Sequence, residues 1–150
     1  MSELFEKSIR TLELPAVLER LAAQAVSDEA KDRARKLFPS TDYDEVRRLQ
    51  DETEAARSML GLQGSPNFSG LKRVAEILAR ADRGGVLNTR ELLLLAGMLR
   101  CARRVKEYFN ADTASHSVID HMFQSLHGNK FLEEKIYSTI LDEDEIADTA

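Results

Sequence analysis

The stretch that decides the fold is NTRELLLLAGMLRCARRVKEYF, residues 88–109. Asn88 is a favourable residue immediately before a helix, and Glu91 follows it at the third helical position. The apolar residues behind this start recur at helical spacing and fill about half of the circumference at 100° per residue. These residues are Leu92, Leu94, Leu95, Met98, Leu99, Cys101, Ala102, Val105 and Phe109. So wide an apolar face predicts a central helix, Thr89 to Phe109, that contacts several neighbours.

The rest of the chain also reads as amphipathic helices separated by short turns. The signals include Pro15 near a helix start, Ser27 as an N-cap, and Asp42 with Glu45 three residues later, a pattern typical of a capping box. The predicted helices span residues 3–10, 15–25, 28–38, 43–60, 71–83, 115–126 and 130–141. We therefore predict an all-α fold of about seven or eight helices. The length of 150 residues favours one domain over residues 1–150.

One glycine-rich loop interrupts the helices, GLQGSPNFSG at residues 61–70. Its three glycines permit turns with positive φ, and Phe68 is predicted to fasten the loop to the core. A phosphate-binding role is disfavoured, because the loop lacks the Gly-Lys-Ser/Thr order of a Walker A motif and follows no strand.

The composition indicates a folded protein of a reducing compartment. Apolar residues make up 43% of the chain and charged residues 31%, which argues against wholesale disorder. Cys101 is the single cysteine and cannot form an internal disulfide, so a cytoplasmic location is expected. The first ten residues do not have the pattern of a signal peptide, and no segment reaches the roughly 20 apolar residues of a membrane span.

The net charge of −5 is unevenly distributed. Residues 72–106 contain nine basic and three acidic side chains, a net of +6, whereas residues 1–71 sum to −3 and residues 107–150 to −8. Cationic side chains at helical spacing suit phosphate groups, so this middle third is the candidate nucleic-acid contact. Its residues are Lys72, Arg73, Arg80, Arg83, Arg100, Arg103 and Arg104. The competing interpretation is a solvated face in which Arg103 pairs with Glu107.

The sequence contains no convincing catalytic, cofactor or metal site. His116, Asp120 and His127 would share a helical face if one helix ran through all three, but zinc needs four closely placed ligands. Cys101 is predicted to face the core, where a thiol is inert. The acidic end, residues 142–148, is expected to be a frayed tail.

Several motifs, in order along the whole chain, resemble one known family. They are TLEL at 11–14, Val17-Leu18, Leu21-Ala22, Ala25-Val26-Ser27, PSTD at 39–42, ETEA at 52–55, GSPNFSG at 64–70, ADRGGVL at 81–87, LRCARR at 99–104 and ILDEDEIADTA at 140–150. The chain is similar to the start of the second bacterial MutS paralogue, the branch that lacks the mismatch-reading domain and carries a C-terminal Smr nuclease domain. The Gly-Ser-Pro loop and the Gly-Gly-Val-Leu turn are the most specific parts of this resemblance.

The resemblance implies that the chain is a non-catalytic part of a larger machine. Proteins of this branch are homodimeric ATPases that use ATP and Mg²⁺, with Walker motifs and the Smr nuclease well downstream. They are associated with suppressing homologous recombination through branched DNA, and with splitting collided ribosomes. Residues 1–150 would form the first part of the helical core and lever region, with no family catalytic residue among them. The alternative is a stand-alone helical domain that binds a partner protein and has no ATPase attached.

Overall fold

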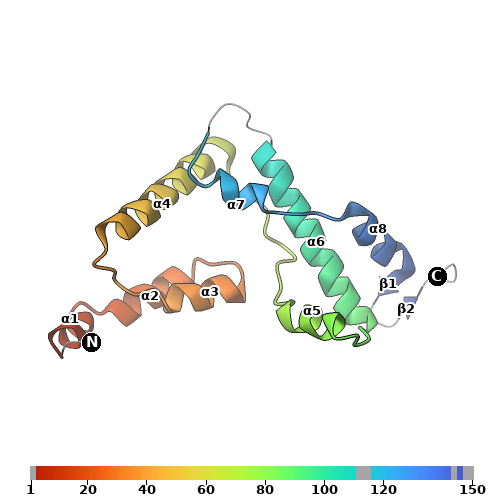
Figure 1. The fold of residues 1–150 in the computed structure, drawn as a ribbon, viewed down its shortest axis with the longest axis horizontal. Coiled ribbons are helices and arrows are strands. Elements are labelled where there is room, and N and C mark those ends of the chain that lie inside the picture. Colours follow the sequence, from red (N-terminus) through yellow and green to blue (C-terminus); the bar gives the residue numbers. More distant parts are fainter. Residues whose placement is uncertain (1–2, 111–115, 143–144, 147–150) are drawn as a thin grey trace. The chain divides into compact units, whose positions relative to one another are not determined.

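Eight helices and one short antiparallel strand pair make up the described part of the chain, which is residues 3–110, 116–142 and 145–146 of a computed structural model (Figure 1). The helices are α1 (Glu3–Thr11), α2 (Leu14–Ala22), α3 (Asp28–Arg35), α4 (Tyr43–Gln63), α5 (Ala75–Asp82), α6 (Thr89–Asn110), α7 (Asp120–Gln124) and α8 (Lys130–Thr139). The strands are β1 (Ile140–Asp142) and β2 (Glu145–Ile146). The all-α class predicted from the sequence is confirmed.

The chain divides into two compact units, Met1–Thr41 and Asp42–Ala150. The prediction of a single domain over residues 1–150 stays a prediction.

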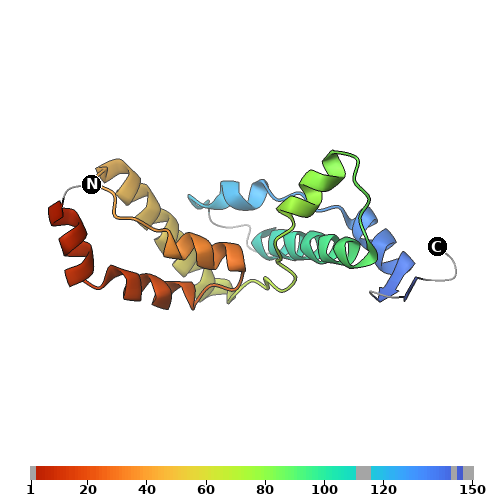
Figure 2. The same ribbon diagram turned by 90° about the horizontal axis from the view of Figure 1, so that it is seen from below.

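The first unit is built on a helical hairpin in which α2 and α3 lie side by side (Figure 2). Ser27 caps α3 as predicted, because its Oγ accepts a hydrogen bond from the Ala30 amide at 3.2 Å. Arg35 on α3 donates to both carboxylate oxygens of Glu19 on α2, at 2.9 and 3.3 Å. Within the described residues of this unit, the buried side chains are small, namely Ala22, Ser27 and Ala34. Its apolar core is therefore thin.

The second unit is organised around α6, the longest helix at 22 residues. α8 packs along it, and Ala96, Ile136 and Ile140 form a buried cluster between them (Figure 1). Near the other end of α6, Phe109 stacks on Phe123 of α7 with ring centroids 4.8 Å apart. The prediction that α6 is a central helix with several neighbours is confirmed.

The start of α6 is held by a reciprocal cap. The Glu91 amide donates to Asn88 Oδ1 at 2.9 Å, and the Asn88 amide donates to Glu91 Oε2 at 3.0 Å. Arg80 of α5 also donates to the Glu91 carboxylate and so ties α5 to this end of α6. These contacts explain why the sequence located the start of α6 correctly.

Several predicted helix ends are wrong. α2 ends at Ala22 rather than at residue 25, and α3 ends at Arg35 rather than at residue 38. α4 continues past Gly61 to Gln63, and Gly64, with a φ of +75°, ends it. α5 begins at Ala75 rather than at residue 71. Tertiary contacts hold the segment between these helices in a non-helical path: Gly70 approaches Gly97 of α6 so closely that a Cβ on Gly70 would lie 2.8 Å from the Gly97 carbonyl oxygen. That contact fastens the loop, whereas the predicted plug, Phe68, is 38% exposed.

The predicted helix 115–126 is also misplaced, because only α7 forms there within the described residues. Ser117 Oγ accepts from the Ile119 amide at 3.4 Å, and such local side-chain bonds compete with helix formation. Residues 111–115, where this helix was predicted to begin, lie outside the described part of the chain.

The end of the chain also departs from the prediction. Ile140 and Leu141 were expected to finish a helix and residues 142–148 to fray, but β1 pairs with β2 in the described residues. Ile140 is buried against Ala96 and Ile136. Acidic residues are unfavourable at a helix C-terminus, which explains why α8 stops at Thr139, before Asp142.

Among the described residues, no helix combines the length and the apolar character that crossing a membrane requires.

Candidate nucleic-acid interface

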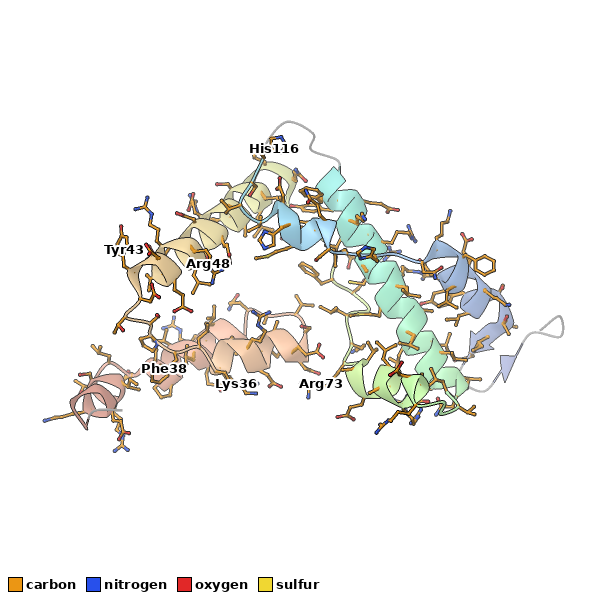
Figure 3. The ribbon with its side chains drawn as sticks, in the orientation of Figure 1. Lys36, Phe38, Tyr43, Arg48, Arg73 and His116 are labelled. Atoms are coloured by element: carbon orange, nitrogen blue, oxygen red, sulfur yellow. The ribbon has the colours of Figure 1, made fainter. Side chains whose placement is uncertain are left out.

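The seven cationic residues predicted to contact nucleic acid come from α5, α6 and the segment before α5. Lys72 and Arg73 precede α5 and are exposed (Figure 3 labels Arg73). Arg80 lies within α5 and Arg83 follows its last turn. Arg100, Arg103 and Arg104 lie on successive turns of α6. The structure thus places all seven in the second unit.

Arg100 and Arg103 converge on one buried carboxylate, Glu133 of α8, which is 3% exposed. Arg100 Nε donates to Glu133 Oε1 at 3.0 Å. Arg103 donates from Nε to Oε2 and from an Nη to Oε1, each at 3.1 Å. The competing interpretation placed these arginines on a solvated face. In the structure both are only partly exposed, and they hold a buried carboxylate between two packed helices.

We call Arg100, Arg103 and Glu133 together the clasp, and two further contacts complete it. The guanidinium of Arg100 lies over the Tyr137 ring, 4.0 Å from its centroid, a cation–π arrangement. Arg103 also pairs with Glu107 at 2.9 Å, as the solvated-face interpretation expected. The positive charge of this pair is therefore largely matched within the protein.

The electrostatics of the clasp follow from these bonds. Hydrogen bonds from Arg103, and then from Arg100, lower the pKa of Glu133, although its burial acts in the opposite direction. The hydrogen bond to Glu133, and then the one to Glu107, raise the pKa of Arg103. Glu133 is therefore an ionised group that holds α6 and α8 together.

Arg80 and Arg83 are also engaged within the fold. Arg80 pairs with Glu91, whose carboxyl pKa is lowered first by that hydrogen bond and then by the bond from the Asn88 backbone. Arg83 Nε donates to the Ala79 carbonyl at 3.0 Å. Glu91 and Arg103 are twelve residues apart, about 18 Å along a helix axis, so the arginines divide into two groups.

Two of the seven cations are exposed and have no polar partner among the described residues, Lys72 and Arg104. They are the members of the predicted set whose charge remains available to a polyanion. Contact with nucleic acid stays a prediction for all seven residues.

Sequence reasoning did not identify Glu133 or Tyr137 as part of this arrangement. The available signal was the position of Glu133, three and seven residues before Ile136 and Ile140. A carboxylate on the buried face of an amphipathic helix requires a partner, and arginines are common partners.

The other predicted features show no site chemistry in the described residues. His116 is fully exposed with Nδ1 3.8 Å from Asp120 Oδ2, and His127 lies beyond the end of α7 (Figure 3 labels His116). No three histidine, cysteine, aspartate or glutamate side chains in that part of the chain come together as a metal site would need. Cys101 is buried as predicted, and burial raises its thiol pKa.

Comparison with known proteins identifies the relatives of this chain. It is 42% identical over 147 residues to endonuclease MutS2 of Ruminiclostridium cellulolyticum, a match that covers 97% of this chain. The corresponding proteins of Acetivibrio thermocellus and Alkaliphilus metalliredigens are 36% and 34% identical, again over 97% of the chain. The chain is homologous to endonuclease MutS2. It spans only 19% of the length of each of these MutS2 relatives. No family model matches the chain.

Proposed function

We propose that this chain is the non-catalytic N-terminal helical segment of a MutS2-like endonuclease, the first part of its core and lever region. The observation that carries the proposal is the match to MutS2 over 97% of the chain and a fifth of each relative. The segment contributes structure and a nucleic-acid contact, while nuclease and ATPase chemistry belong to other parts of the protein.

The family resemblance supports a proposal for the activity of the whole protein. We propose a cytoplasmic homodimer that uses ATP and Mg²⁺, acts on branched DNA to suppress homologous recombination, and splits collided ribosomes. The absence of a Walker A motif from these 150 residues supports an ATP site elsewhere in the protein. Calorimetric titration of this chain with ATP and Mg²⁺ should show no saturable binding; saturable binding would contradict a non-catalytic role.

The proposed nucleic-acid contact is centred on Lys72 and Arg104. Both are exposed, and neither is committed to an acidic partner among the described residues. Phosphate contacts give affinity that falls with salt and lacks sequence preference. Because the chain is acidic overall, its binding to a branched DNA or structured RNA should be weak and salt-sensitive.

A matched pair of double variants tests this contact. The first combines Lys72→Glu with Arg104→Glu, and the control combines Arg20→Glu with Lys135→Glu, which makes the same change in net charge at exposed positions on α2 and α8. Fluorescence anisotropy with a labelled four-way DNA junction at low salt should show loss of binding in the first variant alone. Equal losses in both would assign the effect to net charge and remove the contact.

Substituting Arg100 and Arg103 cannot make this test cleanly. Replacing Arg100, Arg103 and Arg104 together by glutamate would place new carboxylates beside Glu133 and disrupt the packing of α6 on α8. Loss of binding in that triple variant would report unfolding as readily as a lost contact. Retained DNA and ribosome binding by the same triple variant of a full-length protein would leave this patch without a role.

The alternative function is a stand-alone helical domain that binds a partner protein. It is favoured by the large apolar side chains exposed in both units, among them Leu12, Val17, Val26, Phe38, Tyr43 and Leu62. The reading frame beyond Ala150 separates the two functions. A Walker A motif within the next few hundred codons supports the MutS2-like protein, and a stop codon directly after Ala150 supports the stand-alone domain.

A further inference from the structure

The loop of residues 64–70 carries the Gly-Ser-Pro sequence and has no part in the proposed nucleic-acid contact. It lies along one face of α6, because the residues of α6 that it contacts are separated by four and seven positions. They are Gly97, Cys101 and Tyr108. The loop leaves the end of α4 beside Tyr108 and reaches Gly97 at Gly70, so it runs antiparallel to α6.

The two ends of this loop differ in how tightly they are packed. At the far end, a Cβ on Gly70 would lie 2.8 Å from the Gly97 carbonyl oxygen, so backbone touches backbone. At the α4 end, a Cβ on Gly61 or on Gly64 would meet no heavy atom of the described residues within 4 Å. The ring of Pro66 fixes its own φ and restricts the residue before it. Rotational freedom is therefore concentrated at Gly64, which has a φ of +75°.

A tyrosine hydroxyl holds the loosely packed end against α6. Tyr108 Oη donates to the Gly64 carbonyl at 2.8 Å and lies 3.4 Å from the Met59 carbonyl oxygen, so it contacts the end of α4. Burial raises the pKa of the Tyr108 hydroxyl, which keeps it protonated and able to donate at neutral pH. The direction in which α4 leaves α6 is thus tied to this hydrogen bond.

α4 is otherwise packed lightly in the second unit. None of its residues is buried, so the second unit by itself buries none of them. Its side chains face residues 116–118 across a shallow pocket of about 390 Å³. At its end, Gln63 Oε1 is buried without a hydrogen-bond partner among the described residues, which disfavours the observed packing. The favourable Tyr108 contact is therefore opposed by an unsatisfied acceptor only one residue from Gly64.

We propose that α4 is a helix hinged at Gly64, and that the Tyr108–Gly64 hydrogen bond is the latch that sets its direction relative to α6. With the latch formed, α4 has the direction drawn in Figure 1. With the latch broken, α4 turns about Gly64 as one helix, while the contact between Gly70 and Gly97 keeps the rest of the loop on α6. The proposal concerns this chain alone and does not depend on the proposed function.

Distances between nitroxide labels on α4 and α8 test the latch, because α8 is packed on α6. The labels are attached at Gln50→Cys and Lys135→Cys, two exposed positions, in a Cys101→Ser background. The serine hydroxyl can still donate to the carbonyl that Cys101 Sγ contacts. Double electron–electron resonance on labelled chain diluted with unlabelled chain should give a narrow distance distribution for the parent. Tyr108→Phe should broaden that distribution by about twofold or more, because several directions of α4 become populated.

Tyr137→Phe is the matched control for the lost hydroxyl. Tyr137 is also partly buried where α8 packs on α6, but its hydroxyl has no hydrogen-bond partner among the described residues. This substitution should leave the distance distribution of the parent unchanged. A parent distribution as broad as that of Tyr108→Phe overturns the latch, as does equal broadening by both substitutions.

Gly64→Ala tests the hinge in a chain that keeps Tyr108. A residue with a side chain disfavours a φ of +75°, so α4 should take another direction and the mean distance should shift by about 5 Å or more. Gly61→Ala adds the same methyl group within α4, where open space surrounds it, and should not shift the mean distance. Equal mean distances in the two variants contradict the hinge.

Circular dichroism of each variant verifies that the helices form. A chain in which α4 does not move leaves the homology to MutS2 intact, because that rests on sequence identity.

Discussion

α4 and α6 are similar in length, 21 and 22 residues, yet they have opposite environments. α6 buries Ala96, Cys101 and Val105 against its neighbours, whereas α4 buries none of its residues. The difference is visible in the sequence as the width of the apolar face, which is about half of the circumference on α6 and a narrow stripe on α4. A helix with a wide apolar face buries several side chains, whereas the narrow stripe of α4 leaves it with none.

The largest effect should distinguish these two environments directly. Ile136→Ala removes a buried side chain from the α6–α8 cluster and should cost about 3 kcal/mol of unfolding free energy. Leu49→Ala on α4 should cost less than about 1 kcal/mol in dilute solution, because that side chain is already 42% exposed. Urea unfolding followed by circular dichroism measures both. Similar losses would mean that α4 is packed as firmly as α6.

The second prediction concerns the buried carboxylate that joins α6 to α8. Glu133→Ala leaves Arg100 and Arg103 side by side without their shared partner and should cost about 2 kcal/mol. That is less than for a fully buried pair, because both arginines reach solvent. Glu134→Ala is the control, because Glu134 is the next residue in the chain and its carboxylate makes only an exposed ion pair, with Lys130 at 3.5 Å. If both substitutions had the same small effect, the clasp would not stabilise the α6–α8 packing.

A comparable loss of stability is expected where the loop of residues 64–70 contacts α6. Gly70→Ala places a Cβ 2.8 Å from the Gly97 carbonyl oxygen, at a φ of +92° that L-residues rarely adopt, and should cost about 2 kcal/mol. Gly97→Ala places a Cβ at ordinary contact distance inside a helix and should be neutral or stabilising by up to about 1 kcal/mol. The midpoint temperature of thermal unfolding should fall for Gly70→Ala and should stay the same or rise for Gly97→Ala. Equal destabilisation would show that Gly97 has no room for a methyl group.

The smallest effect is a dependence on pH. Hydrogen bonds from Arg103 and Arg100 lower the folded-state pKa of Glu133, so the stability it contributes is fully present above its unfolded pKa of about 4.3. That contribution is lost as the pH falls through the lower, folded-state pKa. The difference in stability between the parent and Glu133→Gln should therefore shrink below about pH 4.3. A difference that stays constant down to pH 2.5 would contradict an ionised Glu133.

Three helix starts, those of α3, α4 and α6, could be predicted from sequence because their determinants are local. Ser27, Asp42 and Asn88 each accept hydrogen bonds from amides two or three residues later in the chain. The helix ends at Gln63 and before Ala75 depend instead on the contact between Gly70 and Gly97, which are far apart in sequence. No local sequence pattern predicts a close contact between two glycines so far apart in the chain.

The candidate interface could be predicted only in part, for the same reason. The basic character of residues 72–106 is a property of the sequence. The partner of Arg100 and Arg103 lies 33 and 30 residues away, on a helix whose packing was not predicted. Composition therefore overstated the positive charge that is available to a polyanion. Within the predicted set, Lys72 and Arg104 are the members without an internal partner among the described residues.

The single thiol of the chain offers a practical consequence of the packing around α6. Cys101 is 2% exposed and its pKa is raised by burial, so little of the reactive thiolate is present or accessible in the native state. An alkylating reagent should modify it only when the structure around that face of α6 opens. The rate of alkylation therefore reports the opening of this unit in unmodified protein, without any introduced probe.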